Sequence, residues 1–165
     1  MSKPGTLVFF SGKMGAGKST KAKELTATMK AILIAEDEWL SSLYPDEINR
    51  FDDYIKYANR LKPLIKSHVQ ELLATGVSVV MDFPGNTRTQ RAWFKEICAE
   101  NTYPHILIYL QADDELCLSR LLLRRDAQPE RASFDTPEVF NQVTAFFEAP
   151  APDEGFNVET IRQLT

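Results

Sequence analysis

Eight residues near the start of the chain carry the clearest chemistry, and they read Gly12-Lys13-Met14-Gly15-Ala16-Gly17-Lys18-Ser19. They match the pattern G-x-x-x-x-G-K-[ST], whose glycines let successive backbone N–H groups point inward around an anion. In this pattern the lysine, here Lys18, reaches the β- and γ-phosphates, and the serine hydroxyl, here Ser19, binds Mg²⁺. The segment therefore predicts a phosphate-binding loop (P-loop) that holds a nucleoside triphosphate with Mg²⁺.

The residues on either side of this loop fit a strand before it and a helix after it. Residues 6–10 form a continuous apolar run typical of a buried strand, and residues 18–29 are predicted to be helical. A helix that opens in the loop turns the positive end of its dipole toward the phosphates. An ordinary glycine-rich turn is the alternative, but such a turn has no need for Lys-Ser after its last glycine. We therefore expect ATP contacts from Gly12, Lys13, Met14, Gly15, Ala16, Gly17, Lys18, Ser19 and Thr20.

Acidic residues follow two further apolar runs that are predicted to be strands. Asp82 follows residues 77–81, where P-loop enzymes place an acidic residue near Mg²⁺, and it is predicted to act there with Ser19. Asp37 follows residues 31–35 and is predicted to face the γ-phosphate from the acceptor side. A carboxylate in that place can take the proton of an attacking hydroxyl group. The alternatives are a strand-end turn for Asp82 and favourable acidity at a helix start for Asp37.

Asp37 stands between two other carboxylates, Glu36 and Glu38. Side chains alternate along an extended chain, so one of the three carboxylates points away from its neighbours. The sequence pattern alone does not show which of the three carboxylates acts as the base.

Three arginines end a helical pattern predicted over residues 113–125, namely Arg120, Arg124 and Arg125. The first and second are four residues apart and share one helical face. The apolar pattern then stops, so residues 124–136 are predicted to form a small mobile lid, in which Arg131 is a further candidate. Because phosphoryl transfer spreads negative charge over the phosphate oxygens, Arg120 and Arg124 are predicted to stabilise that charge when the lid closes. A solvated basic helix end is the alternative.

Other side chains could contribute to an acceptor pocket. Arg88 and Arg91 begin the helix predicted after the third strand, and they are predicted to bind an acidic or phosphorylated substrate, with exposure to solvent as the alternative. Four aromatic residues could wall such a pocket, although packing in the core is the favoured interpretation for each: Trp39, Tyr44, Phe51 and Tyr54.

Apolar runs and helical patterns alternate along the chain, which indicates βαβ units and a parallel sheet. Strands are predicted at residues 6–10, 31–35, 77–81, 105–110 and 155–161. Helices are predicted at residues 18–29, 47–75 with a bend or split at Pro63, 87–100 and 113–125, with a further helix that begins at 135 or 136 and ends at Pro150. The expected fold is an α/β, P-loop NTPase, three-layer αβα sandwich with a five-stranded, mostly parallel sheet and a small lid. The 165 residues are predicted to form a single domain, residues 1–165.

Composition narrows the range of partners. The net charge of −4 argues against the broad basic face that extended nucleic acid requires, although a cleft for one nucleotide stays compatible with it. The two cysteines, Cys98 and Cys117, lie in apolar helical patterns and are predicted to be reduced, buried thiols of a cytoplasmic protein. Neither a signal sequence nor a membrane span is expected. The sequence assigns no oligomeric state.

With these residues assembled, the chain resembles the small P-loop kinases related to zeta toxins, chloramphenicol phosphotransferase and the kinase domain of phage polynucleotide kinase. The resemblance covers nearly the whole chain and is carried by Ser11–Thr20, Ala35–Glu38, Val79–Asp82, Asn86–Arg91, Leu118–Arg125, Phe147–Pro150 and Glu154–Val158. It implies that the Asp82 strand lies beside the P-loop strand and that Mg-ATP is the phosphate donor. It also implies that Asp37 activates an acceptor hydroxyl, that Arg120 lies near the nucleotide and that Arg124 lies on the lid. As a departure from some relatives, neither a phosphatase domain nor a basic surface for long nucleic acids is expected in these 165 residues.

These expectations together predict an ATP-dependent kinase that transfers the γ-phosphate to a hydroxyl group of a small molecule. A nucleotide-binding switch or ATPase regulator is the alternative from another class. A toxin-type kinase and a kinase of nucleic-acid ends are alternatives within the same class. The identity of the acceptor is not readable from the sequence.

Overall fold

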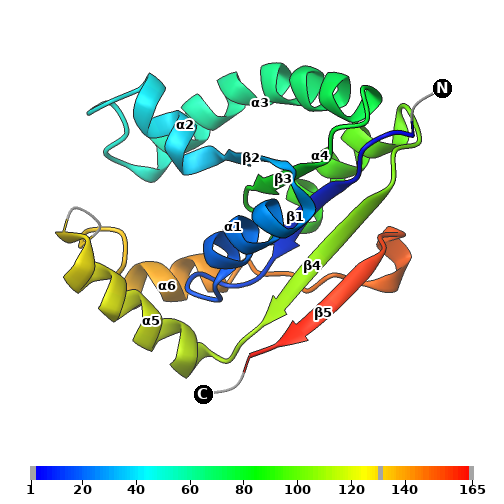
Figure 1. Ribbon diagram of the computed structural model, residues 1–165. Helices are drawn as coiled ribbons and strands as arrows, with labels where there is room; N and C mark the ends of the chain where they lie inside the picture. Colours follow the sequence, from blue (N-terminus) through cyan, green and yellow to red (C-terminus); the bar gives the residue numbers. More distant parts are fainter. Residues whose placement is uncertain (1–2, 130–131, 164–165) are drawn as a thin grey trace.

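The sheet at the centre of the molecule contains five parallel strands in the order β2-β3-β1-β4-β5. The computed structural model describes residues 3–129 and 132–163, and Figure 1 shows helices on both sides of the sheet. The strands are β1 (Leu7–Ser11), β2 (Ile32–Ala35), β3 (Val79–Asp82), β4 (His105–Gln111) and β5 (Val158–Arg162). The predicted α/β fold with a five-stranded sheet is therefore confirmed, and all five strands are parallel.

Three of the helices begin where the sequence supplies a capping side chain. The helices are α1 (Lys18–Met29), α2 (Glu36–Leu43), α3 (Phe51–Ala74), α4 (Arg88–Ala99), α5 (Asp114–Ala127) and α6 (Pro137–Thr144), followed by a 3₁₀ turn at Pro152–Glu154. The side chains of Thr87, Asp113 and Thr136 accept backbone N–H groups at the starts of α4, α5 and α6. Such caps satisfy helix donors that would otherwise lack partners.

Two helices differ from the sequence prediction. Helix α3 begins at Phe51 and continues through Pro63 without a split. Pro63 lies on the exposed side, while Leu61 and Ile65 on either side of it are buried, so core packing holds the helix together across the missing backbone donor. Helix α2, which the sequence prediction did not include, follows β2 directly at Glu36.

Side chains of alternate β1 residues enter two separate cores. Leu7 and Phe9 join one cluster, which includes residues of α3 and α4, and Val8 and Phe10 join the other, which includes residues of α1 and α5. Because both faces of the sheet are covered, the strands are apolar throughout. Polar groups therefore gather at the carboxyl ends of the strands, which is where ligands bind in sheets of this kind.

Strand pairing brings three of the expected site segments together. Strand β1, which leads into the P-loop, pairs with β3, which ends at Asp82, as the resemblance implied. Strand β3 also pairs with β2, and Ala35 lies opposite Asp82 in the register. The segments that begin at Gly12, Glu36 and Phe83 thus leave the same edge of the sheet.

Two further expectations concern the cysteines and membranes. Cys98 and Cys117 are both buried and free of disulfides, as predicted. Across residues 3–129 and 132–163, none of the helices combines the length and the apolar character needed to cross a bilayer.

Candidate active site

The P-loop has a backbone path that favours glycine at two positions. Gly15 and Gly17 have φ angles of 79° and 97°, in the left-handed region that favours glycine. A Cβ atom at Gly15 would lie 2.5 Å from the carbonyl oxygen of Cys117 on α5. The loop is therefore closely packed under α5, and a side chain at Gly15 would displace it.

Helix α1 presents an uncapped N-terminus to this loop. Its N-cap is Gly17, no side chain caps its first turn, and that turn contains no acidic residue. The first N–H groups of the helix thus lack side-chain partners, and the positive end of the helix dipole is not neutralised by its own first turn. An anion such as a phosphate group is well suited to this position.

Lys18 is held within the loop. Its Nζ atom donates a hydrogen bond to the carbonyl oxygen of Gly12 at 2.6 Å. Burial lowers the pKa of Lys18 to about 8, even though the negative charges of Asp82 and Asp37 act in the opposite direction. The two carboxylates do not fully compensate the desolvated ammonium group, so a bound polyphosphate would stabilise its charged form.

Lys13, at the second position of the loop, is turned toward α5. Its Nζ atom forms an ion pair with Asp114 at 2.7 Å, and that hydrogen bond raises the pKa of Lys13. Ser19 and Thr20 are exposed at the start of α1. Of the predicted nucleotide contacts, Lys13 is thus held by α5, and Ser19 and Thr20 face solvent.

Asn86 is a site residue to which the sequence analysis gave no role. Its Oδ1 atom accepts the backbone N–H of Gly12 at 2.9 Å and the Nζ atom of Lys18 at 3.4 Å. Its own backbone N–H donates to the side chain of Gln90 at 2.8 Å. Asn86 therefore connects the turn after β3 to the loop lysine. The signal was its place in the sequence, between the strand-end Asp82 and the helix cap Thr87.

Ser19 and Asp82 form a pair suited to Mg²⁺. The hydroxyl of Ser19 is hydrogen-bonded to Asp82, and burial is the main cause that raises the pKa of Asp82, with the charge of Asp37 adding to it. A nearby cation would favour the ionised carboxylate. Within the part of the chain that the structure describes, no three His, Cys, Asp or Glu residues form a metal site by themselves. Mg²⁺ is usually bound by one or two protein groups together with phosphate oxygens and water.

The structure separates the three neighbouring carboxylates. Because they occupy the first turn of α2, they point in different directions around a helix and do not alternate as in the extended chain that was expected. Glu36 is buried and accepts a hydrogen bond from the hydroxyl of Tyr54, whereas Asp37 and Glu38 are exposed. The charge of Asp37 affects the pKa values of both Lys18 and Asp82. Asp37 thus lies within electrostatic reach of the P-loop lysine.

We expect Glu36 to make stability fall as pH rises from about 4.5 to 7. Burial raises the pKa of Glu36 from 4.5 to about 7; Asp37 and Asp82 also raise it, and Tyr54 and Lys62 oppose the shift. A raised pKa means that the folded state holds a proton which the unfolded state releases, so ionisation at higher pH costs folding free energy.

Urea unfolding of the wild type and Glu36→Gln at several pH values measures this cost. Relative to the variant, the free energy of unfolding of the wild type should fall by about 3 kcal/mol between pH 4.5 and neutrality. Glutamine keeps the shape and an acceptor for Tyr54 without the charge. A difference between the two proteins that stays constant with pH contradicts the expectation.

The arginines of α5 lie in two different settings. Arg120 donates from Nη1 to the carbonyl oxygens of Ala16 at 3.1 Å and Gly15 at 3.4 Å, so it lies against the P-loop. Arg124 donates from Nε and Nη2 to the two carboxylate oxygens of Asp135, each at 2.7 Å. Its positive charge nevertheless contributes to lowering the pKa of Lys18. Residues 130–131 of the expected lid, which include the candidate Arg131, lie outside the described residues.

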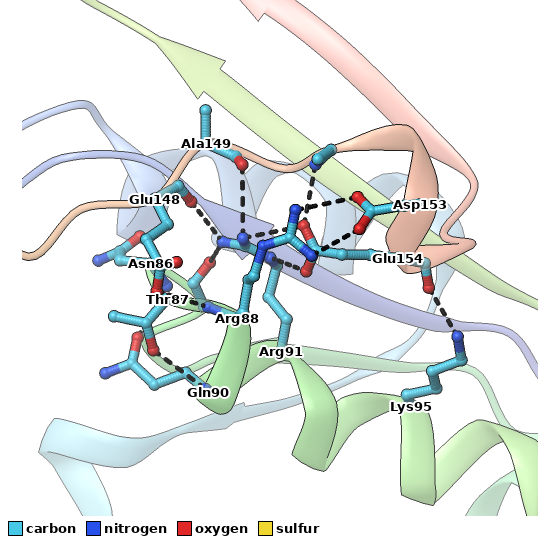
Figure 2. Close-up of polar contacts among 12 residues, drawn as sticks. Asn86, Thr87, Arg88, Gln90, Arg91, Lys95, Glu148, Ala149, Asp153 and Glu154 are labelled. Atoms are coloured by element: carbon cyan, nitrogen blue, oxygen red, sulfur yellow. Dashed lines mark hydrogen bonds and ion pairs between the residues drawn. The ribbon is translucent and has the colours of Figure 1, made fainter.

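Arg91 does not lie in an acceptor site, which corrects the sequence prediction. Its side chain is fully buried and forms an ion pair with Glu154, with Nε 2.7 Å from Oε1. Its Nη1 atom donates to the carbonyl oxygens of Gly85 and Glu148 at 3.0 and 2.8 Å. Figure 2 shows that Arg91 connects α4 to the chain after α6. It has no exposed surface to offer a substrate.

Arg88 is bound to the same C-terminal segment at the surface. Its Nη1 and Nη2 atoms each lie 2.9 Å from a carboxylate oxygen of Asp153 (Figure 2). The predicted substrate contact of Arg88 is therefore replaced in this structure by an exposed ion pair. Neither pairing could be predicted from the sequence, because the partners are about sixty residues away along the chain.

A cavity of about 150 Å³ opens between the end of β3 and helices α2, α3 and α4. It is lined by Glu36, Phe51, Tyr54, Ile55, Ala58, Asn59, Lys62, Phe83, Pro84, Gln90 and Trp93. Two of the aromatic residues considered in the sequence analysis, Phe51 and Tyr54, thus line a cavity next to the candidate base. The other two, Trp39 and Tyr44, are partly buried against the core.

The comparisons with known proteins agree with this arrangement. The family model described as an AAA domain matches residues 7–150. The chain belongs to this family. No curated protein matches the sequence.

Solved structures similar to this AAA-domain protein include kinases. A candidate kinase from Chloroflexus aurantiacus has a TM-score of 0.75 and 17% identity, covering 98% of this chain and 89% of that one. The Mycobacterium tuberculosis APS kinase CysC, solved with AMPPNP and APS, has a TM-score of 0.63 and 20% identity, with coverages of 95% and 88%. Kti12 from Chaetomium thermophilum, solved with ADP-AlF3, has a TM-score of 0.69 and 15% identity, with coverages of 94% and 88%. The protein therefore has the fold of the small P-loop kinases.

Proposed function

We propose that this protein is an ATP-dependent kinase that transfers the γ-phosphate to a hydroxyl group of a small molecule. The observation that carries the proposal is the position of Asp37, which lies within electrostatic reach of Lys18 and Asp82 and of Glu36 and Tyr54, two residues that line a separate cavity. A site built only to bind or hydrolyse ATP has no need for such a cavity. The APS kinase neighbour was solved with a nucleotide and a second ligand, which supports the same division of the site.

The residues divide into donor and acceptor groups. Residues 12–20 and the N-terminus of α1 hold the triphosphate, and Lys18 neutralises its charge. Ser19 and Asp82 would hold Mg²⁺, which would neutralise phosphate charge when it is bound. Arg120 lies beside the P-loop, and Arg124 is near enough to affect Lys18, so both add positive charge around the transferred group.

The reaction on this proposal is an in-line displacement. The acceptor oxygen forms a bond to the γ-phosphorus while the bond from that phosphorus to the β,γ-bridging oxygen breaks. Asp37 accepts the proton of the acceptor hydroxyl, and ADP leaves with the bridging oxygen. Positioning and charge neutralisation supply most of the rate acceleration in such reactions. The preorganised P-loop therefore contributes more to the rate than proton transfer to Asp37 does.

Lys18→Ala should abolish nucleotide binding without unfolding the protein. A non-hydrolysable ATP analogue at about 100 times its Kd should stabilise the wild type by about 2.7 kcal/mol. The variant should show no such stabilisation, since it lacks the ammonium group that faces the phosphates. Thermal unfolding with and without the analogue and Mg²⁺ measures this, and Lys56→Ala on α3 controls for the loss of an ammonium group elsewhere. Equal stabilisation of the wild type and Lys18→Ala contradicts the assignment.

Phosphate transfer itself is tested by incubating the protein with ATP and a set of small hydroxyl compounds. A kinase yields ADP together with a phosphorylated acceptor, and the acceptor accelerates ATP consumption. An ATPase or switch yields free phosphate whatever hydroxyl compound is present. The second outcome would replace the proposed function by the switch alternative.

A further inference from the structure

The cavity beside Asp37 is lined by two pairs of aromatic rings. Phe51 and Tyr54 of α3 lie with ring centroids 5.9 Å apart. Phe83, which follows β3, and Trp93 of α4 lie 5.6 Å apart. Aromatic rings prefer to pack against other flat rings in stacked or edge-to-face contact. Four rings around one small cavity therefore favour a flat ring as its occupant.

The polar groups of the cavity are few. Glu36 and Tyr54 form a hydrogen-bonded pair, Gln90 and Asn59 contribute amides, and the Nζ atom of Lys62 lies 5.7 Å from the Trp93 ring centroid. A few placed polar groups in an apolar cavity are what fixes the orientation of a small ligand. The carboxyl group of Glu36 can bind the hydrogen-bonding edge of a ring.

The charges of the cavity do not favour a phosphorylated acceptor. Among the described residues that line it, Lys62 is the single cation. Arg88 and Arg91, which were expected to bind an acidic substrate, are held by Asp153 and Glu154. Sites that recognise phosphate usually present arginine forks or several donors, and this cavity instead includes the carboxyl group of Glu36.

The size of the cavity matches one six-membered ring. Its volume is about 150 Å³, and an apolar cavity of about 150 Å³ in another protein binds benzene. Two of its lining residues neighbour the proposed catalytic groups in sequence, since Glu36 precedes Asp37 and Phe83 follows Asp82. The charge of Asp37 also acts on Glu36 and Tyr54, which both line the cavity, so a ring held there lies within electrostatic reach of Asp37.

We propose that this cavity binds a flat, uncharged six-membered ring of the acceptor, aromatic or heteroaromatic, and that the hydroxyl to be phosphorylated is on a short side arm at Asp37. This inference rests on the proposed function, and it adds the substrate class. Glu36 and the four rings are the residues that determine specificity.

Ring binding can be measured directly because Trp93 lines the cavity. The chain has two tryptophans, so Trp39→Phe leaves Trp93 as the single tryptophan reporter. The probes are benzyl alcohol and 3-pyridinemethanol, compared with cyclohexylmethanol, glucose and glucose 6-phosphate. Each is titrated in the presence of a non-hydrolysable ATP analogue. The two flat alcohols should change Trp93 emission saturably and bind about fivefold more tightly than cyclohexylmethanol, since aromatic contacts contribute about 1 kcal/mol beyond burial.

Two variants test the location of this binding. Ala58→Leu fills the cavity, and Phe51→Ala removes a ring that is 65% exposed, so the second variant should fold even where the first is strained. Both should weaken binding of the flat alcohols about tenfold or more while the affinity for the ATP analogue is unchanged. Leu64→Ala is the matched control, because Leu64 is 71% exposed on the same helix and does not line the cavity.

The possible outcomes separate the two proposals. Tighter binding of glucose or glucose 6-phosphate than of the flat alcohols overturns the ring proposal, and so does flat-alcohol binding that neither Ala58→Leu nor Phe51→Ala weakens. If ATP phosphorylates one of the sugars and the ring alcohols do not bind, the proposed kinase function stands and the ring proposal fails. If the ring alcohols bind in wild type and in Lys18→Ala but no alcohol is ever phosphorylated, the ring site stands and the kinase function fails.

Discussion

Replacing Asp37 by asparagine should reduce phosphate transfer about 10²- to 10⁴-fold and leave ATP binding nearly unchanged, which is the usual loss when a general base is removed. Asparagine has almost the shape of aspartate but accepts no proton at neutral pH. The side chain is exposed in the first turn of α2, so the fold should tolerate the change. Single-turnover transfer to an acceptor and titration with an ATP analogue measure the two effects separately.

The neighbouring carboxylate provides the matched control. Glu38 is also exposed in the first turn of α2, and Glu38→Gln should transfer phosphate at nearly the wild-type rate. Asp37→Asn with wild-type transfer would show that Asp37 is not the base. A large loss in Glu38→Gln and none in Asp37→Asn would assign the role to Glu38.

The donor half of the site was predictable because its constraints are local. A tight loop around an anion requires glycine at fixed positions, and φ angles of 79° and 97° at Gly15 and Gly17 meet that requirement. Lys18 and Ser19 then follow at the opening of α1. The strand-end position of Asp82 was readable for a similar reason, since a continuous apolar run ends there. Spacing along the chain is enough to predict such features.

The acceptor half depends on contacts between distant segments. Arg91 looked free in the sequence because nothing near it marks Glu154 as its partner, yet the ion pair spans sixty-three residues. Asn86 reaches Gly12 across seventy-four residues. Packing in the core was the favoured interpretation of Phe51 and Tyr54, and only the packing of α3 beside α4 placed them around a cavity. Tertiary packing decided each of these cases.

The three carboxylates of α2 show how local structure changes an assignment. In an extended chain they would alternate between two faces, whereas the first turn of a helix points them in three directions. Glu36 turned toward Tyr54, became buried and acquired a pKa of about 7. That left Asp37 exposed beside the P-loop. The start of α2, which the sequence did not indicate, therefore sets Glu36 apart and leaves Asp37 and Glu38 exposed.

The buried arginine gives the largest expected effect on stability. Arg91→Met should destabilise the protein by about 3–5 kcal/mol, because removal of one partner leaves a charged group without compensation in a desolvated place. The Glu154 side chain is only 8% exposed, and the carbonyl oxygens of Gly85 and Glu148 would also lose their donor. Urea unfolding of the wild type and the variant measures the difference in free energy.

The double variant Arg91→Met/Glu154→Gln should recover part of that loss, since no unpaired charge then stays buried. Arg88→Met is the matched control on the same helix. The Arg88 and Asp153 side chains are 48% and 68% exposed, so solvent compensates both charges and the free energy of unfolding should hardly change. If Arg91→Met is as stable as Arg88→Met, the C-terminal segment is not held by this ion pair. If Arg91→Met is unstable and the double variant recovers nothing, the hydrogen bonds to Gly85 and Glu148 carry the stability instead of the charge on Glu154.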